Sequence, residues 1–438
     1  MTATPWGEAE RLAARKLPPG PGGDREAIAR QQRERLFGAM VAVVADKGYE
    51  ATRVEDVLVL AGVSRNGFYK LFSSKRDCFV QMLEEVERHA RPVMLAPVPD
   101  GDDRWDLRLR ALLDRLAALL VSQPALARAA WVEVYAAGPE AVAVVERIDR
   151  TVERAVSAAL DESPERAGMP RAIVRALVGA VRKLVHDRVR SDRVDELPEL
   201  MGDVFDWLNS YLTPPRALRR PRRVPAELLP AQRPPADARE RILVAVTEIV
   251  AAKGYPEMAI TEIAGRAAVS LTTFYHHFDG KEEAFVEAFW RGHRIVFDTV
   301  APVVATAADW ESSIALGARA LTGCQTAMPE IATLSGIGVW ATSPAGMDVR
   351  YQAIDTFKAF LDEGFRLHPD TPVTARDGIA AAVDALMYET LRHRGAERMY
   401  EVAPTFAYIV LAPFVGAERA CELANAGVDE LRGRGSAG

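Results

Sequence analysis

Two stretches of the sequence decide the fold, and they are Glu55–Lys75, EDVLVLAGVSRNGFYKLFSSK, and Thr261–Lys281, TEIAGRAAVSLTTFYHHFDGK. The similarity between them extends without a gap over Arg33–Val80 and Arg239–Val286, at a constant offset of 206 positions. Of the 48 aligned pairs 18 are identical, whereas chance would give only a few. The chain therefore uses one structural unit twice.

Each copy has the pattern of two short helices joined by a tight turn. In the first copy we expect the helices at Val54–Ala61 and Ser64–Phe72, with Gly62 in the turn between them. A short turn with glycine between two short helices is typical of the helix-turn-helix, and glycine readily adopts the left-handed conformation that ends a helix. We expect Val63 and Phe68 to close the small core between the helices.

The second helix of such a motif enters the major groove of DNA, where its first residues meet base edges and its flanking groups meet phosphates. A solvated helix face is the alternative for any one of these residues, but it does not explain similar residue types in register in two copies. The DNA contacts that we expect are Ser64, Arg65, Asn66, Gly67, Tyr69, Lys70 and Lys75 in the first copy and Ser270, Leu271, Thr272, Thr273, Tyr275, His276, His277 and Lys281 in the second.

The two quoted strings resemble the DNA-binding region of TetR-type transcriptional regulators, and their repetition resembles the tandem regulators of that type in actinobacteria. The resemblance runs from the Lys-Gly-Tyr that ends at Tyr49 to Lys75, and again from the one that ends at Tyr255 to Lys281. It implies that Tyr69 and Tyr275 contact phosphate or base, that Lys75 and Lys281 contact phosphate, and that Arg65–Gly67 and Leu271–Thr273 read bases.

Three positions depart from the family pattern. Arg53 and Ala259 stand where the family often has a Ser or Thr cap, and Ala268 replaces the turn glycine. Arg53 is long enough to reach a phosphate, so we include it among the DNA contacts, whereas Ala259 is not. The first copy has eight basic and six acidic side chains and the second has five and seven, so their formal charges are +2 and −2. Because phosphate neutralisation supplies much of the affinity for DNA, we expect the second motif to be the weaker reader.

The composition is that of a globular protein with two to three domains, since 49% of the 438 residues are hydrophobic and 26% are charged. With a net charge of −6, any nucleic-acid surface must be local. The three cysteines are too far apart for a zinc site or a disulfide framework and fit a reducing cytosol. The first twenty residues lack the apolar stretch of a secretory signal, so we expect a cytoplasmic protein.

Apolar residues keep helical spacing outside the motifs, and no strand-like alternation persists. The expected fold class is all-α, with two tandem TetR-like units, each a helix-turn-helix region followed by a helical ligand-binding and dimerisation domain that the resemblance implies. Further helices are predicted at Leu107–Val121, Pro139–Leu160, Ala172–Val189, Met347–Phe365 and Thr374–His393.

The expected division of the chain is a loose arm at 1–27, DNA-binding domains at 28–80 and 237–286, helical domains at 81–212 and 287–433, and a linker at 213–236. The linker holds seven of the 27 prolines and six arginines against one acid, which favours an extended, semi-rigid spacer. Its Arg219–Arg223 cluster suits either a solvated linker or a contact with DNA phosphates.

The longest charge-free runs, Ile331–Met347 and Val402–Ala417, fall short of the ~20 apolar residues that span a bilayer, so we expect no membrane contact. They are expected either to wall a cavity or to seal an interface. The resemblance implies a small-molecule effector, and these runs favour an apolar or amphipathic one. The ligand-binding candidates are Trp340, Met347, Phe406 and Tyr408.

Enzyme and scaffold functions are the alternatives. The glycines of Gly336–Ala341 have dinucleotide-fingerprint spacing, but no strand precedes them, so helix packing is the better interpretation. His276 and His277 point about 100° apart on a helix, without a suitably spaced carboxylate or cysteine. We therefore expect no catalytic residue, metal or cofactor, and we interpret the isolated pair His186-Asp187 as solvated. A scaffold that has lost DNA binding would have damaged reader helices, which the first copy does not show.

Ordinary members of this family are homodimers that pair through a four-helix bundle. Here one chain supplies both copies, so the last helices of each half, about Ala172–Tyr211 and Thr374–Val415, are able to pair within the chain. We expect a monomeric pseudo-dimer that represses transcription from an asymmetric double-stranded operator and is released by its effector. A homodimer of whole chains is the alternative.

Overall fold

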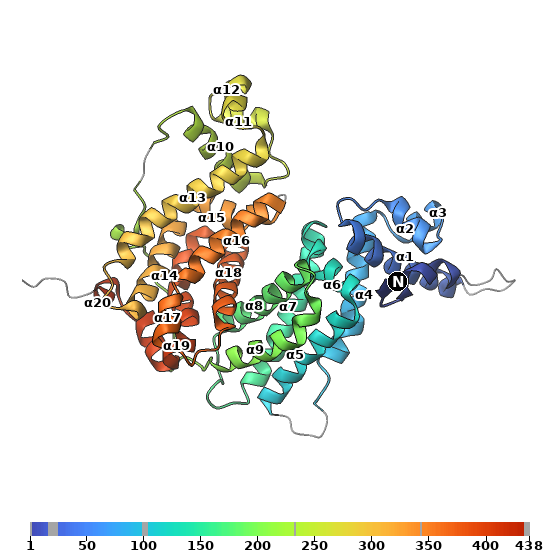
Figure 1. The fold of residues 1–438 in the computed structure, drawn as a ribbon, viewed down its shortest axis with the longest axis horizontal. Coiled ribbons are helices and arrows are strands. Elements are labelled where there is room, and N and C mark those ends of the chain that lie inside the picture. Colours follow the sequence, from blue (N-terminus) through green and yellow to red (C-terminus); the bar gives the residue numbers. More distant parts are fainter. Residues whose placement is uncertain (1, 16–24, 99–103, 232–233, 342–343, 433–438) are drawn as a thin grey trace, which may run out of the picture. The chain divides into compact units, whose positions relative to one another are not determined.

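The computed structural model describes residues 2–15, 25–98, 104–231, 234–341 and 344–432, without the side chains of residues 25, 340, 341 and 344–347. The part of the chain that it describes is helical almost throughout (Figure 1), which confirms the all-α prediction. Its two strands are β1 (Ala3–Thr4) and β2 (Gly7–Glu8), which pair antiparallel near the N-terminus.

Helices of the first half follow in chain order. They are η1 (Ala9–Arg15), α1 (Arg25–Lys47), α2 (Val54–Ala61), α3 (Arg65–Leu71), α4 (Lys75–Met94), α5 (Trp105–Ser122), α6 (Pro124–Trp131), η2 (Glu133–Tyr135), α7 (Pro139–Leu160), α8 (Arg171–Arg190), η3 (Val194–Glu196) and α9 (Leu197–Asn209), where η marks a 3-10 helix.

Helices of the second half begin with the linker turn η4 (Ala226–Leu228). They continue with α10 (Ala238–Lys253), α11 (Ile260–Arg266), α12 (Leu271–His277), α13 (Lys281–Val304), α14 (Trp310–Ala327), α15 (Pro329–Gly336), η5 (Gly338–Ala341), α16 (Pro344–Ala359), α17 (Asp362–Leu367), α18 (Ala375–Arg394), η6 (Ala396–Val402), α19 (Ala403–Asn425) and α20 (Val428–Leu431).

One predicted helix is interrupted. The single helix expected over Met347–Phe365 is instead two helices, α16 and α17, separated by Phe360 and Leu361. The Trp310 indole N–H donates to the carbonyl oxygen of Phe360 at 3.0 Å. A Cβ on Gly364 would be 2.3 Å from the Trp310 ring, so this glycine allows α17 to pack against the indole.

The two helix-turn-helix motifs have the same core. Phe68 and Phe274 occupy equivalent positions and are completely buried, and Val63 is also buried, as predicted. A basic side chain of the first helix joins the end of the second helix in both copies. Arg35 donates to the carbonyl oxygen of Ala61 at 3.2 Å, and Arg241 donates to that of Ala267 at 3.0 Å.

The chain folds into two compact units whose boundary differs from the repeat boundary. The first unit is Met1–Pro164 with Val181–Phe205, and the second is Glu165–Ala180 with Asp206–Gly438. We expected all of 81–212 to belong to the first half. Residues 165–180 and 206–212 of that range instead join the second unit, because their side chains pack within it.

Three contacts inside the second unit account for this. The Tyr211 hydroxyl donates to the carbonyl oxygen of Ile409 at 2.8 Å. Gly378 lies against the Trp207 ring, and a Cβ on this glycine would be 2.7 Å from the ring. Gly179 lies equally tightly against Ala385, so α8 and α18 approach closely at two small residues.

The linker is bound to the second unit and is not a free spacer. The backbone N–H of Arg219 donates to the side-chain oxygen of Asn425 at 2.7 Å, and its guanidinium donates to the Asn425 carbonyl. Leu228 is completely buried. The proline-rich segment was expected to be an extended, semi-rigid spacer, with its arginine cluster either solvated or in contact with DNA phosphates. It is held instead because its few apolar residues and backbone groups find partners on α14 and α19.

The predicted loose arm is ordered over residues 2–15. Leu12 is completely buried, and the Trp6 ring lies 5.3 Å from that of Phe37. Gly38 makes this packing possible, because a Cβ there would be 3.0 Å from the methyl groups of Leu12. The second copy has Val244 at the equivalent position and has no such arm.

One helical stretch in the described part of the chain, Ala396–Asn425, is long and apolar enough to cross a membrane. Within its most apolar window, 78% of the residues are buried inside the protein. This burial is typical of a core helix. The stretch includes the charge-free run Val402–Ala417, which therefore belongs to the core of the second unit.

Candidate functional site

The first reader helix, α3, starts at a well-formed turn. Gly62 has a left-handed backbone with φ of 60°, as the sequence predicts. Ser64 then caps α3, since its hydroxyl oxygen accepts a hydrogen bond from the Gly67 N–H at 3.1 Å. The capped N-terminus leaves the first turn of α3 exposed to solvent, which suits contact with a phosphate or a base edge.

The predicted contact residues of the first copy mostly lie on that exposed surface. Asn66, Tyr69 and Lys70 are exposed, and so is Arg53 at the start of α2. Arg65 pairs with Glu55 at 2.9 Å and extends over the Tyr69 ring. An exposed ion pair of this kind contributes little to stability. The guanidinium is therefore able to leave Glu55 and contact DNA.

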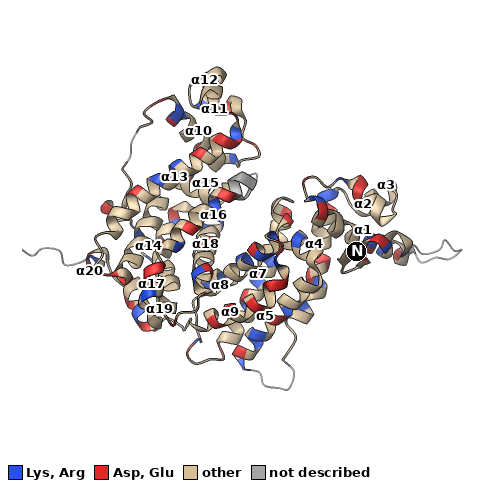
Figure 2. Ribbon diagram, viewed as in Figure 1, with Lys and Arg blue, Asp and Glu red and all other residues tan. Residues whose placement is uncertain are grey.

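The second reader helix, α12, repeats the geometry with different chemistry. Ala268 has φ of 51°, the left-handed conformation that Gly62 has in the first copy. The Ser270 hydroxyl accepts from the Thr273 N–H at 2.9 Å. Leu271 and Tyr275 are exposed large side chains. Helix α12 contains no Lys, Arg, Asp or Glu (Figure 2).

The remaining predicted DNA contacts on α12 differ in their exposure to solvent. Thr272 and His276 are exposed, whereas Thr273 and His277 are half-buried. The His276 and His277 rings lie 5.2 Å apart. The accessible surface of α12 therefore consists of hydroxyl, imidazole, aromatic and aliphatic groups, which suit apolar contact and hydrogen bonding to bases.

Lys75 and Lys281, which we expected to contact phosphate, donate hydrogen bonds within their own motifs. The Lys75 ammonium donates to the carbonyl oxygens of Tyr49 and Thr52 at 2.7 and 2.9 Å and lies 4.2 Å from the centre of the Tyr49 ring. Lys281 donates to the Met258 carbonyl at 3.4 Å. Partial burial lowers the pKa of Lys75. Both ammonium groups tie the segment just before α2 or α11 to the helix that follows the reader, and the expected phosphate contact stays a prediction.

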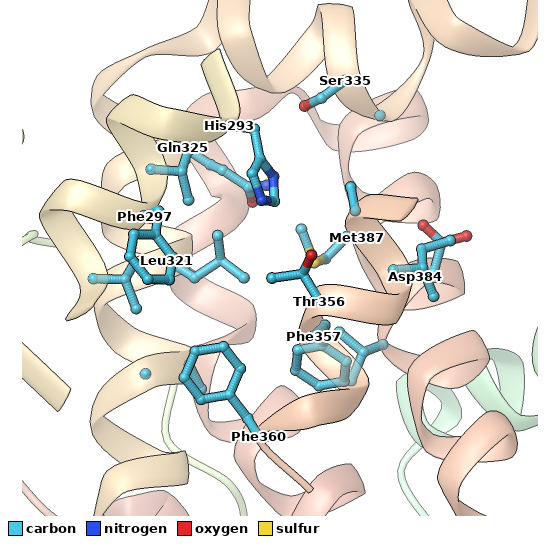
Figure 3. Close-up of a pocket in the computed structure, with 18 of the residues that line it drawn as sticks. His293, Phe297, Leu321, Gln325, Ser335, Thr356, Phe357, Phe360, Asp384 and Met387 are labelled. Carbon is cyan, nitrogen blue, oxygen red and sulfur yellow. The ribbon is translucent and has the colours of Figure 1, made fainter. Parts of the chain in front are cut away.

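A second candidate site is a cavity of about 240 Å³ inside the second unit. It is lined by α13, α14, α15, α16 and α18 (Figure 3). Phe406 of α19 also lines it. Most of its wall is apolar. Its side chains include Phe289, Phe297, Leu321, Phe357, Phe360 and Met387.

The sequence located only part of this cavity. Phe406 lines it, as predicted. Tyr408 is not among the lining residues, because it is buried with its hydroxyl donating to the Leu212 carbonyl at 2.6 Å. The side chains of Trp340 and Met347 lie outside the described residues. The sequence analysis missed the face of α13 that carries Phe289, His293 and Phe297. Their spacing of four residues is the signal that places them on one face of a helix.

The polar side chains that line the cavity include His293, Gln325, Arg350 and Asp384. Burial lowers the pKa of His293, so its imidazole is neutral at pH 7. Arg350 and Asp384 neutralise each other at 2.5 Å. The side-chain oxygen of Gln325 is buried and has no hydrogen-bond partner among the described residues.

The cavity and the second reader helix belong to one continuous structure. Three residues separate the end of α12 from the start of α13. Phe289 and His293 of α13 line the cavity. Phe289 also belongs to the core of the second motif, together with Phe274.

The dinucleotide-like glycines serve helix packing, as predicted. A Cβ on Gly336 would lie 2.4 Å from Leu391, and one on Gly338 would lie 2.6 Å from Val250. Both glycines allow α15 and η5 to fit between α10 and α18. In the described structure helix α15, not a strand, leads into these glycines, whereas a dinucleotide fingerprint follows a strand.

The pair His186-Asp187 is not solvated as expected. His186 is buried in the first unit, with its ring 6.0 Å from that of Tyr135, because α8 packs its inner face there. Its Nδ1 is 3.1 Å from the Asp187 carboxylate. Burial nevertheless lowers the pKa of His186, so the imidazole is neutral at pH 7.

The two motifs define a helix-turn-helix DNA-binding protein, since each presents the exposed N-terminus of a reader helix on a rigid core. The sequence profile of the bacterial regulatory proteins of the tetR family matches at residues 38–82 and 242–288, which coincide with the two motifs. The chain therefore carries two DNA-binding domains of the TetR type in tandem. Both matches are to regulatory proteins, not to enzymes.

Several solved structures are similar to part of the chain. The fatty acid degradation regulator FadR from Bacillus halodurans is 17% identical with a TM-score of 0.37, and 44% of this chain covers 96% of it. The FadR from Bacillus subtilis in complex with stearoyl-CoA is 20% identical with a TM-score of 0.35, at coverages of 40% and 96%. A TetR-like transcriptional regulator from Rhodococcus sp. RHA1 is 23% identical with a TM-score of 0.33, at coverages of 43% and 96%. No curated protein sequence matches the chain.

Proposed function

We propose that this chain is a cytoplasmic, ligand-responsive repressor that binds one asymmetric operator with α3 and α12. The observation that carries the proposal is that one scaffold presents two exposed reader helices of unlike chemistry. Arg65 and Asn66 on α3 suit guanine and adenine edges, whereas Leu271 and Thr272 on α12 suit a thymine methyl group and a hydrogen bond. The two half-sites should therefore differ in sequence.

Release by a small apolar molecule is the second part of the proposal. The cavity of the second unit has an apolar wall and shares α13 with the second motif. A ligand that fits the cavity only when α13 is displaced would lower the affinity for DNA, and DNA would lower the affinity for the ligand by the same factor.

We further propose that one chain suffices for binding. The contacts of Trp207 with Gly378 and of Tyr211 with Ile409 support pairing of the last helices within the chain. Half-sites would then lie about one helical turn apart, ~34–36 Å, on one face of the duplex. A homodimer of whole chains would instead give a longer, palindromic operator.

Selection of bound DNA from a random or genomic pool tests the proposal directly. We expect one site with two unlike halves, and a complex that contains a single chain of 47.9 kDa by light scattering. Arg65→Ala should change base preference in one half only, and Thr272→Ala in the other. A perfectly palindromic site bound by two chains would contradict the proposal. Failure to select any sequence would favour a scaffold that has lost DNA binding.

A further inference from the structure

We infer that the effector is an uncharged, mostly aromatic compound with one hydroxyl group, and that the Gln325 amide recognises this hydroxyl. The inference rests on the proposed function of the cavity as the effector site. It is argued from the charge, the polar groups and the size of the cavity.

The cavity wall has no unbalanced charge. Arg350 is buried, and it donates both to Asp384 at 2.5 Å and to the carbonyl oxygen of Ser335 at 3.1 Å. His293 is neutral at pH 7 because burial lowers its pKa. A carboxylate or an ammonium in the cavity would therefore be buried without an opposite charge, unless it broke the pair of Arg350 and Asp384.

Gln325 is the polar group that the fold leaves unsatisfied. Its side chain is only 7% exposed, and its amide oxygen has no hydrogen-bond partner in the described part of the chain. An unpaired buried acceptor is costly, so a ligand hydroxyl that donates to it contributes binding free energy. Figure 3 shows Gln325 beside His293 at one end of the cavity, with Phe297 and Leu321 next to them.

Size and lining favour an aromatic skeleton. A cavity of about 150 Å³ accommodates benzene, so 240 Å³ accommodates a larger, substituted or fused ring. Phe297, Phe357 and Phe360 face this space (Figure 3). Phe297 and Phe360 are 47% and 39% exposed, so they form an apolar entrance through which such a ligand can reach the Gln325 amide.

Three probes with one skeleton test the inference on the full-length chain by calorimetry. They are 2-naphthalenemethanol, 2-methylnaphthalene and 2-naphthoate. We expect the alcohol to bind more tightly than the hydrocarbon, and the carboxylate to bind at least about a hundredfold more weakly than the alcohol. Gln325→Leu should weaken binding of the alcohol about three- to tenfold and leave the hydrocarbon unaffected.

Gln352→Leu is the matched control, since Gln352 is exposed on α16 and does not line the cavity. Gln325→Met keeps the length of the side chain and replaces Gln325→Leu if that variant unfolds. The inference is overturned if the carboxylate binds as tightly as the alcohol, if the alcohol does not bind, or if both Gln325 variants keep the full preference for the alcohol.

The same titration is repeated with operator DNA present, so that the two proposals fail separately. Binding of the alcohol without any loss of DNA affinity contradicts the proposed function and leaves the assignment of ligand chemistry intact. Release of DNA by 2-naphthoate but not by the alcohol supports an effector site and overturns the ligand chemistry inferred from Gln325 and the pair of Arg350 and Asp384.

Discussion

The ammonium of Lys75 lies 2.7 Å from the carbonyl oxygen of Tyr49 and 4.2 Å from the centre of its ring. Lys281 lies 4.8 Å from the ring of Tyr255, which is the equivalent tyrosine of the second copy. Two copies with opposite formal charge thus keep the same cation over the same ring. The contact therefore belongs to the scaffold that holds the reader helix, whatever DNA the helix reads.

Replacing Lys75 should affect stability more than DNA binding. Lys75→Met leaves two carbonyl groups without their donor, and we expect a loss of about 1–3 kcal/mol in the free energy of unfolding of the first motif. Lys70→Met, at an exposed position of α3, should leave stability unchanged and reduce the salt dependence of DNA binding by about one unit of slope. Chemical denaturation and gel shifts over a salt series distinguish them. A stable Lys75→Met variant with a reduced salt slope would restore the phosphate contact implied by the family.

Removing the charge of Glu55, which pairs with Arg65, should change the affinity for DNA. Glu55→Gln frees the guanidinium and removes a negative charge close to the phosphates, so DNA should bind several-fold more tightly. Arg65→Ala should cost ~1–3 kcal/mol at one base position. Titration with the selected operator measures both. Weaker binding by Glu55→Gln would mean that Glu55 orients Arg65 in the complex.

The left-handed alanine of the second turn is a strained position. Ala268→Gly should raise the free energy of unfolding of the second motif by about 1 kcal/mol, because a Cβ disfavours φ of 51°. The reciprocal variant Gly62→Ala should lower the stability of the first motif by a similar amount. Chemical denaturation of both variants is the measurement, and an unchanged Ala268→Gly variant would argue against strain at this turn.

The N-terminal arm should contribute to the stability of the first motif. Leu12→Ala removes a completely buried side chain and should cost ~2–5 kcal/mol. Gly38→Val introduces the residue of the second copy and should be destabilising as long as Leu12 is present. In the Leu12→Ala background the same Val should be less destabilising, with Thr4 Oγ1 at 3.1 Å as the remaining close neighbour of its Cβ. Additive effects in this double-mutant cycle would show that the two residues are not in contact.

Acid should destabilise the protein through His186. Because burial lowers the pKa of His186, the unfolded chain takes up the proton first as pH falls. The contribution of His186 is thus fully present above the ordinary pKa of about 6.5 and is lost as pH falls from there through the lower folded value. We expect the melting temperature to fall between pH 7.5 and pH 5.5, and to fall less in His186→Asn. His89→Asn, at an exposed position, is the control and should melt like the parent at both pH values.

The two motifs were predictable from the sequence because their signals are local. Gly62 ends a helix, Ser64 begins the next, and Phe68 follows one turn later, so three nearby residue types specify the turn and its core. Repetition at a constant offset then identified the tandem arrangement. The helix Pro139–Leu160 was predicted to the residue for the same reason, since its start at a proline and its apolar spacing are local features.

Features that join distant residues were decided by the tertiary structure. The roles of Lys75 and of the linker depend on acceptors 26 and 206 positions away, at Tyr49 and Asn425, which no local pattern reveals. The cavity likewise brings His293, Gln325 and Met387 together from three helices. Sequence determined that the chain has two reader helices on an all-α scaffold, because helix and turn formation depend on neighbouring residues. Tertiary packing decided which polar groups remain available for DNA or a ligand, because burial and hydrogen bonding to remote backbone groups satisfy the others.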